Sequence, residues 1–129
     1  MGVIIHYLLM VTISICLTSV ESTYSRVATF YSPYVPSACF GNQDEGYCVA
    51  GGGDELWDNG AACGLLYEVV STGPVNQGVP QPCTNEAIVV RIVDYNPGAT
   101  TIINLSLPAF ATIANLDAGS VSVNLVRVR

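Results

Sequence analysis

Apolar residues alternate with polar ones, or run together, in five segments that follow residue 22, and each segment predicts a β-strand. The segment 87–93 is almost entirely apolar and β-branched, which is typical of a strand in the core. In the last segment the apolar positions change parity between Leu125 and Val126, which predicts a bulge or a bend. The predicted strands cover residues 26–31, 47–50, 65–70, 87–94 and 121–128.

Helical patterns occur only in short stretches. Residues 107–115 have apolar positions at helical spacing, with Ser106 as a suitable N-cap. Residues 54–58 could form one helical turn that is capped by Asp54. The segment 71–84 contains three prolines, which predicts a loop and not a core strand. Short strands, little helix and no internal repeat predict a small, mostly β barrel.

The first 22 residues follow a different pattern. An apolar run reaches Leu17, and Val20 and Ser22 then occupy the positions of small residues before a signal-peptidase cut. The run contains polar interruptions and is short for a membrane span, which needs about 20 apolar residues. We therefore expect residues 1–22 to be a signal peptide and residues 23–129 to form one secreted domain that does not insert into a membrane.

Loss of this leader changes the chemistry that the chain can support. His6 is the sole histidine, so the mature domain lacks Ser-His-Asp triads, Cys-His pairs and histidine metal sites, and we expect no metal or cofactor. Ten acidic residues less Glu21, against four arginines, leave a net charge near −5. An acidic domain without a basic patch argues against binding to nucleic acid or to anionic membranes.

Four cysteines remain after cleavage, and their number favours disulfides in a small secreted domain. No CxxC unit occurs among them, which disfavours a zinc site. They are Cys39, Cys48, Cys63 and Cys83.

Asp94 is the first candidate for function because it ends the apolar segment 87–93. A carboxylate at the end of a core strand is costly to bury unless it is hydrogen-bonded or faces a groove. The simpler interpretation is a turn into Asn96 and Pro97, which Asp commonly initiates. Motifs elsewhere in the chain, considered together with Asp94, favour the functional interpretation over the turn.

Six motifs, taken in order, carry a resemblance to a known family. They are Ala28-Thr29-Phe30-Tyr31, Ser37-Ala38-Cys39, Trp57-Asp58-Asn59-Gly60-Ala61-Ala62-Cys63-Gly64, Gly78-Val79-Pro80-Gln81-Pro82-Cys83, Val93-Asp94-Tyr95, and Leu105-Ser106 with Ala109-Phe110. Together they resemble the plant natriuretic peptide-like proteins, secreted relatives of the first domain of expansins, of family 45 glycoside hydrolases and of barwin. The resemblance runs from about Arg26 to Arg129. It implies a six-stranded double-psi β-barrel with one or two short helices and an open polysaccharide-sized groove.

The resemblance also implies which residues line the groove. These are Thr29, Tyr31, Trp57, Asp58, Asp94 and Asn104. For Tyr31 and Trp57, packing in the core or in a loop is at least as plausible as stacking on a sugar. Asn104 stands where expansins and family 45 hydrolases carry a second acidic residue. Inverting hydrolysis needs two carboxyl groups, and an amide supplies neither a general acid nor a general base. Asn104-Leu105-Ser106 is also an N-glycosylation sequon, although a glycan there would obstruct the groove.

The resemblance supports a disulfide between Cys39 and Cys63. Ser71 stands where the family has the cysteine that pairs with the equivalent of Cys83, and Asn96 replaces a further family cysteine. Cys48 is not at a usual family position, so Cys48 and Cys83 either pair with each other or remain free thiols.

From this resemblance we expect a secreted, monomeric, non-hydrolytic protein of the apoplast that influences water and solute balance. Its expected partner is a cell-wall polysaccharide or a cell-surface receptor. Two alternatives stay open: an expansin-like module that binds or loosens wall polysaccharides, and a weak glycan-cleaving enzyme centred on Asp94 alone.

Overall fold

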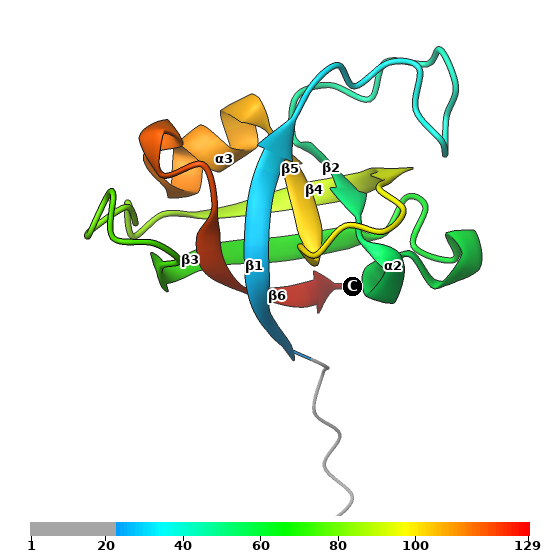
Figure 1. The fold of residues 1–129 in the computed structure, drawn as a ribbon. Helices are drawn as coiled ribbons and strands as arrows, with labels where there is room; N and C mark the ends of the chain where they lie inside the picture. The colour runs from blue at the N-terminus through cyan, green and yellow to red at the C-terminus, as the bar shows by residue number, and fades with distance from the viewer. Residues whose placement is uncertain (1–22) are drawn as a thin grey trace, which may run out of the picture.

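The computed structural model describes residues 23–129, so the expected signal peptide, residues 1–22, lies outside the described residues (Figure 1). All five predicted strands are present, and a sixth, β5, was not predicted by the residue pattern. The strands are β1 (Thr23–Tyr31), β2 (Val49–Gly52), β3 (Leu66–Pro74), β4 (Ala87–Tyr95), β5 (Ile103–Ser106) and β6 (Val121–Val128). The helices are α2 (Asp54–Trp57) and α3 (Leu107–Ile113), with the 3-10 turns η1 (Asp58–Gly60) and η2 (Leu116–Ala118).

The six strands close into one barrel in the order β1-β5-β2-β4-β3-β6. The pairs β1–β5 and β2–β4 are parallel, and the other pairs are antiparallel. This arrangement confirms the expected six-stranded barrel. In Figure 1, α2 and α3 lie on opposite sides of it.

The barrel interior is filled by the apolar positions of the alternating strands. In β6, for example, Val121, Val123 and Leu125 are fully buried while the residues between them are partly exposed. The helix α3 contributes Phe110, whose ring lies 4.9 Å from that of Phe30 on β1. The side chain of Ser106 accepts a hydrogen bond from the backbone N–H of Ala109, which confirms Ser106 as the N-cap of α3.

Two predictions made from the strand patterns were wrong. β3 continues through Ser71 to Pro74, where a loop was predicted. Beyond Val70 this strand pairs only with β6, so Pro74 sits at an open strand end where its missing N–H does little harm. The predicted bulge between Leu125 and Val126 is also absent, because β6 pairs regularly there, and the irregularity lies on β3 between Ser71 and Gly73.

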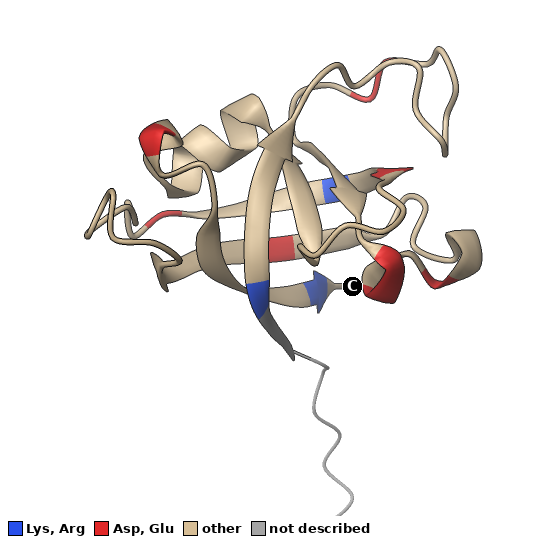
Figure 2. Ribbon diagram, in the orientation of Figure 1, with Lys and Arg blue, Asp and Glu red and all other residues tan. Residues whose placement is uncertain are grey.

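Charged residues are sparse on the barrel. Figure 2 shows arginines singly on β1, β4 and β6, while acidic residues gather at α2. Within residues 23–129 no helix has the length and apolarity needed to cross a membrane. The same part of the chain holds no group of three or more His, Cys, Asp or Glu side chains that could bind a metal ion.

Candidate functional site

Four of the six strands bring polar residues and one glycine into a single row, which we call the Asp94 row. Thr29 on β1 pairs with Asn104 on β5, Asn104 pairs with Gly51 on β2, and Gly51 pairs with Asp94 on β4. The apolar neighbours of the first three belong to the core; they are Ala28, Ala50, Ile103 and Leu105. Since successive side chains alternate between faces, the row lies on the outer face of the barrel.

A β-bulge turns Asp94 toward this row. Ala50 pairs with Ile92, but the next residue of β2, Gly51, pairs with Asp94, so Val93 is an extra residue in β4. Without the bulge, Asp94 would have the same parity as Ile92, which is buried in the core. Bulges commonly re-aim side chains beside functional sites. A uniform alternation of the kind assumed from the sequence could not reveal this one.

The Asp94 carboxylate is half-buried and held in one orientation. Its Oδ1 accepts hydrogen bonds from the backbone N–H groups of Ala38 and Tyr95, each at 3.1 Å. The loop that carries Ala38 is fixed to β4, because the N–H of Cys39 donates to the carbonyl of Val93 at 2.9 Å. The Cys39–Cys63 disulfide is formed as expected and anchors the same loop. Oδ2 accepts no hydrogen bond from residues 26–129, which leaves it available to a ligand.

Tyr31 lies close enough to Asp94 to respond to its charge. Burial, and then the Asp94 carboxylate and Tyr34, raise the pKa of the Tyr31 phenol far above its ordinary value. Its hydroxyl is buried and has no hydrogen-bond partner in the described part of the chain. The rings of Tyr31 and Tyr34 meet edge to face at 5.4 Å, so the packing role considered for Tyr31 is real. The phenol therefore stays protonated.

Asn104 occupies the middle of the row and is almost completely buried, with 4% of its surface exposed. Its Oδ1 accepts a hydrogen bond from the Thr101 hydroxyl at 2.9 Å, while Nδ2 is buried without a partner among the described residues. A glycan would have to attach to this inaccessible nitrogen, so the folded domain leaves no room for one. The neighbouring Thr29 hydroxyl donates to the carbonyl of Gly119 at 2.9 Å.

Trp57 and Asp58 lie outside the Asp94 row. The indole of Trp57 is half-buried and stacks on Tyr95, with ring centres 4.8 Å apart and planes 6° from parallel. One face of the indole is thus covered, as the packing interpretation requires. Asp58 is exposed and ends α2 in a left-handed conformation with φ of 49°. No hydrogen bond or ring contact connects either residue directly to Asp94 among the described residues.

The prediction that Asp54 caps α2 was wrong, because Gly53 occupies the N-cap position. Its carboxylate instead accepts a hydrogen bond from the Tyr95 hydroxyl at 2.5 Å and lies 3.3 Å from the N–H of Gly98. The hydrogen bond to Asp54 is the main cause of the raised pKa of Tyr95. Sequence reasoning assigned Tyr95 no role here, and only its position next to Asp94 could have suggested one.

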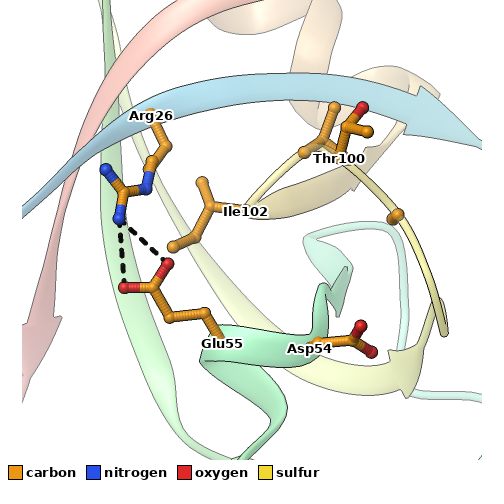
Figure 3. A pocket seen from close by; sticks show the side chains of 7 residues that line it. Arg26, Asp54, Glu55, Thr100 and Ile102 are labelled. Atoms are coloured by element: carbon orange, nitrogen blue, oxygen red, sulfur yellow. Dashed lines mark hydrogen bonds and ion pairs between the residues drawn. The ribbon is translucent and has the colours of Figure 1, made fainter.

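A hollow of about 190 Å³ lies beside this cluster, but Asp94 does not line it. Figure 3 shows it between β1 and α2, where Arg26 on β1 forms an ion pair with Glu55 at 3.1 Å. Both side chains are more than half exposed, so the pair contributes little to stability. A second hollow, of about 300 Å³, is lined by the proline-rich loop after β3 and by Cys83.

Cys48 and Cys83 are free thiols, so the alternative in which they pair with each other is not realised. Cys48 is exposed, and the sulfur of Cys83 instead lies 2.5 Å from the hydroxyl of Ser71. The serine therefore occupies the place of a cysteine partner.

Comparisons with known proteins find relatives over most of this chain. The lytic transglycolase family model matches residues 49–125. An EG45-like domain containing protein of Citrus jambhiri is 44% identical over 126 residues, covering 95% of this chain and 96% of that protein. The EG45-like domain containing protein 2 of Arabidopsis thaliana is 36% identical over 104 residues, covering 80% and 78%.

Solved structures show the same fold. A mutant Clavibacter michiganensis expansin in complex with cellohexaose has a TM-score of 0.65 at 23% identity, covering 84% of this chain. The chain spans about half of that expansin, 51% of its length. A Streptomyces papain inhibitor has a TM-score of 0.64 at 25% identity, covering 84% of this chain and 96% of the inhibitor.

Proposed function

Because the chain belongs to the EG45-like, expansin-related family of double-psi β-barrel domains, we propose that it is a secreted cell-wall protein that binds a neutral polysaccharide at the Asp94 row without cleaving it. The related expansin whose structure contains cellohexaose supports a glycan as the ligand. Asp94 supports it chemically, because its free Oδ2 can accept a hydrogen bond from a sugar hydroxyl. An acidic domain also suits an uncharged ligand better than an anionic one.

One observation carries the non-hydrolytic part of the proposal: an amide, Asn104, lies where a second carboxyl group would be needed. An inverting hydrolase requires an acid to protonate the departing oxygen and a base to activate water. Tyr31 is a poor substitute acid, because burial and the nearby Asp94 hold its pKa far above the usual range. Asp94 can orient a water molecule or a hydroxyl, but the leaving group still lacks a proton donor.

The test compares binding with cleavage. We expect the mature domain to be retained by at least one of insoluble cellulose, immobilised xyloglucan and chitin, and to release no reducing ends from any of them. Asp94→Asn is the matched variant, because its remaining oxygen can still accept from the Ala38 and Tyr95 N–H groups. We expect this variant to fold normally and to bind more weakly.

Two results would contradict the proposal. Failure to bind any of the three glycans would remove the polysaccharide-binding function. Reducing ends that are released by the unmodified protein and lost in Asp94→Asn would instead support the glycan-cleaving alternative.

Secretion and a physiological role are further parts of the proposal. The apolar leader before Thr23 supports export to the apoplast, and N-terminal sequencing of secreted material that found Met1 intact would contradict it. A role in water and solute balance, through the wall or a surface receptor, is supported by the resemblance to natriuretic peptide-like proteins alone. Loss of that response in plants that express the Asp94→Asn variant would link it to the glycan site.

A further inference from the structure

Asn96, which follows β4 directly, lies at the Asp94 row although no family motif assigns it a role there. A methyl group added to Gly51 would lie 3.5 Å from Nδ2 of Asn96 and 3.5 Å from Cβ of Asp94. Both side chains therefore border the space above Gly51. The position of Asn96 is fixed by its backbone N–H, which donates to the carbonyl of Gly52 at 3.0 Å.

The side-chain amide of Asn96 is free of hydrogen bonds in the described part of the chain. It is half-buried, and its side chain makes no hydrogen bond within residues 26–129. On the other side of Gly51, Nδ2 of Asn104 is buried and likewise unpartnered in the described structure. A buried donor without a partner is rare in folded proteins and calls for a specific explanation, such as a bound ligand or water. The unused amide of Asn96 and the half-free carboxylate of Asp94 thus border Gly51, and the buried amide of Asn104 lies on the neighbouring strand.

We propose that Asn96 is a ligand-contacting residue of the Asp94 row, where it binds a neutral sugar together with Asp94. The inference rests on the proposed glycan-binding function. One sugar hydroxyl donates to Oδ2 of Asp94, and a neighbouring oxygen of the same sugar accepts from the amide of Asn96. Gly51 forms the floor, because it lacks the side chain that would fill this space. A uronic acid is disfavoured, because its carboxylate would approach Asp94 with no arginine in the row to balance the charge.

Two variants test the contact without disturbing the barrel. Asn96→Ala removes the donor and should weaken binding three- to tenfold, the range for one neutral hydrogen bond. Gly51→Ala places a methyl group in the ligand space and should weaken binding more than tenfold. Its contacts of 3.5 Å are ordinary, so the fold should be kept. The matched controls are Gln77→Ala, which removes an exposed amide from the loop after β3, and Gly73→Ala, whose added methyl group would meet nothing within 4 Å.

The measurement is calorimetric titration of the mature domain with cellohexaose, a xyloglucan heptasaccharide, chitohexaose and trigalacturonate, with urea unfolding of every variant as the check on folding. We expect binding of a neutral oligosaccharide at least tenfold tighter than that of trigalacturonate. Normal binding by folded Asn96→Ala and Gly51→Ala would overturn the role of Asn96, and equal affinity for trigalacturonate would overturn the preference for neutral sugars. Either result would leave the glycan-binding function intact. If the unmodified domain binds none of the four, both proposals are wrong.

Discussion

Replacing Asn104 with aspartate tests the electrostatic reasoning behind the site. The substitution puts a carboxyl group at a position with 4% exposure, one strand away from Gly51 and two from Asp94. Burial disfavours the charged form, and so does the Asp94 carboxylate, so both raise the pKa of the new group in the folded state. The unfolded chain leaves it at the ordinary value for aspartate.

The expected loss of stability can be worked from these surroundings. Burying a carboxylate costs several kcal/mol, about 4 kcal/mol for this position. The Thr101 hydroxyl already contacts residue 104 and would donate to the charged group, which returns about 2 kcal/mol. The net loss at neutral pH is therefore about 2 kcal/mol. A group whose pKa is raised on folding keeps its stability below the unfolded pKa and loses it as the pH rises through the folded pKa. The free energy of unfolding of the variant should therefore equal that of the unmodified domain near pH 4 and be lower at pH 7.

Urea unfolding at pH 4 and pH 7 measures this difference, with Gln77→Glu as the control that converts an exposed amide into a carboxyl group. Bacterially produced protein avoids any effect of the lost sequon. If Asn104→Asp and Gln77→Glu show the same pH dependence, the burial argument is wrong. Asn104→Asp also supplies the second carboxyl group that inverting hydrolysis requires, so we expect slow release of reducing ends that disappears when Asp94→Asn is added.

Three further substitutions have definite expected outcomes. Replacing Cys39 and Cys63 by serine opens a loop with a sequence separation of 24 and should lower the free energy of unfolding by about 3.5 kcal/mol, measured by urea unfolding; a loss below about 1 kcal/mol would contradict this. Ser71→Cys should form a disulfide with Cys83, given their present contact, and raise stability by about 3 kcal/mol; intact mass that shows both thiols free would refute it. Tyr31→Phe removes a buried hydroxyl that has no partner in the described chain, so stability should stay equal or rise by up to about 1 kcal/mol, and a clear loss in thermal unfolding would reveal a missed hydrogen bond.

The strands that could be predicted from the sequence are those with long apolar patterns. β4 and β6 each have eight or more residues, and the apolar run of β4 and the alternation of β6 identify them without knowledge of their neighbours. β5 has four residues, two of them the polar Asn104 and Ser106, and it is a strand only because β1 and β2 flank it. The residue pattern predicted a small, mostly β barrel, but its six-stranded double-psi form followed from family resemblance, since local patterns do not determine strand order.

The candidate site was predicted in part. Asp94 and Asn104 lie in one row with Thr29, as the resemblance implied, but the bulge that brings Asp94 there depends on pairing with β2. Gly51 and Asn96 were missed because their contribution depends on the three-dimensional arrangement. Gly51 matters because it has no side chain at this place in the row, and Asn96 matters because the chain after β4 brings its amide beside Asp94. Neither property leaves a local signal in the sequence.

The closed ring has a consequence for how the chain folds. β1 pairs with β5 and β6, so the first strand to be synthesised finds its partners only among the last segments. Nearly the whole domain must therefore leave the ribosome before the barrel can close. Until then the backbone N–H and C=O groups at both edges of β1 stay unpaired. Chains dominated by such distant pairings fold slowly and expose unpaired edges while they do so. Export in an unfolded state would postpone this step until the complete domain can fold at once.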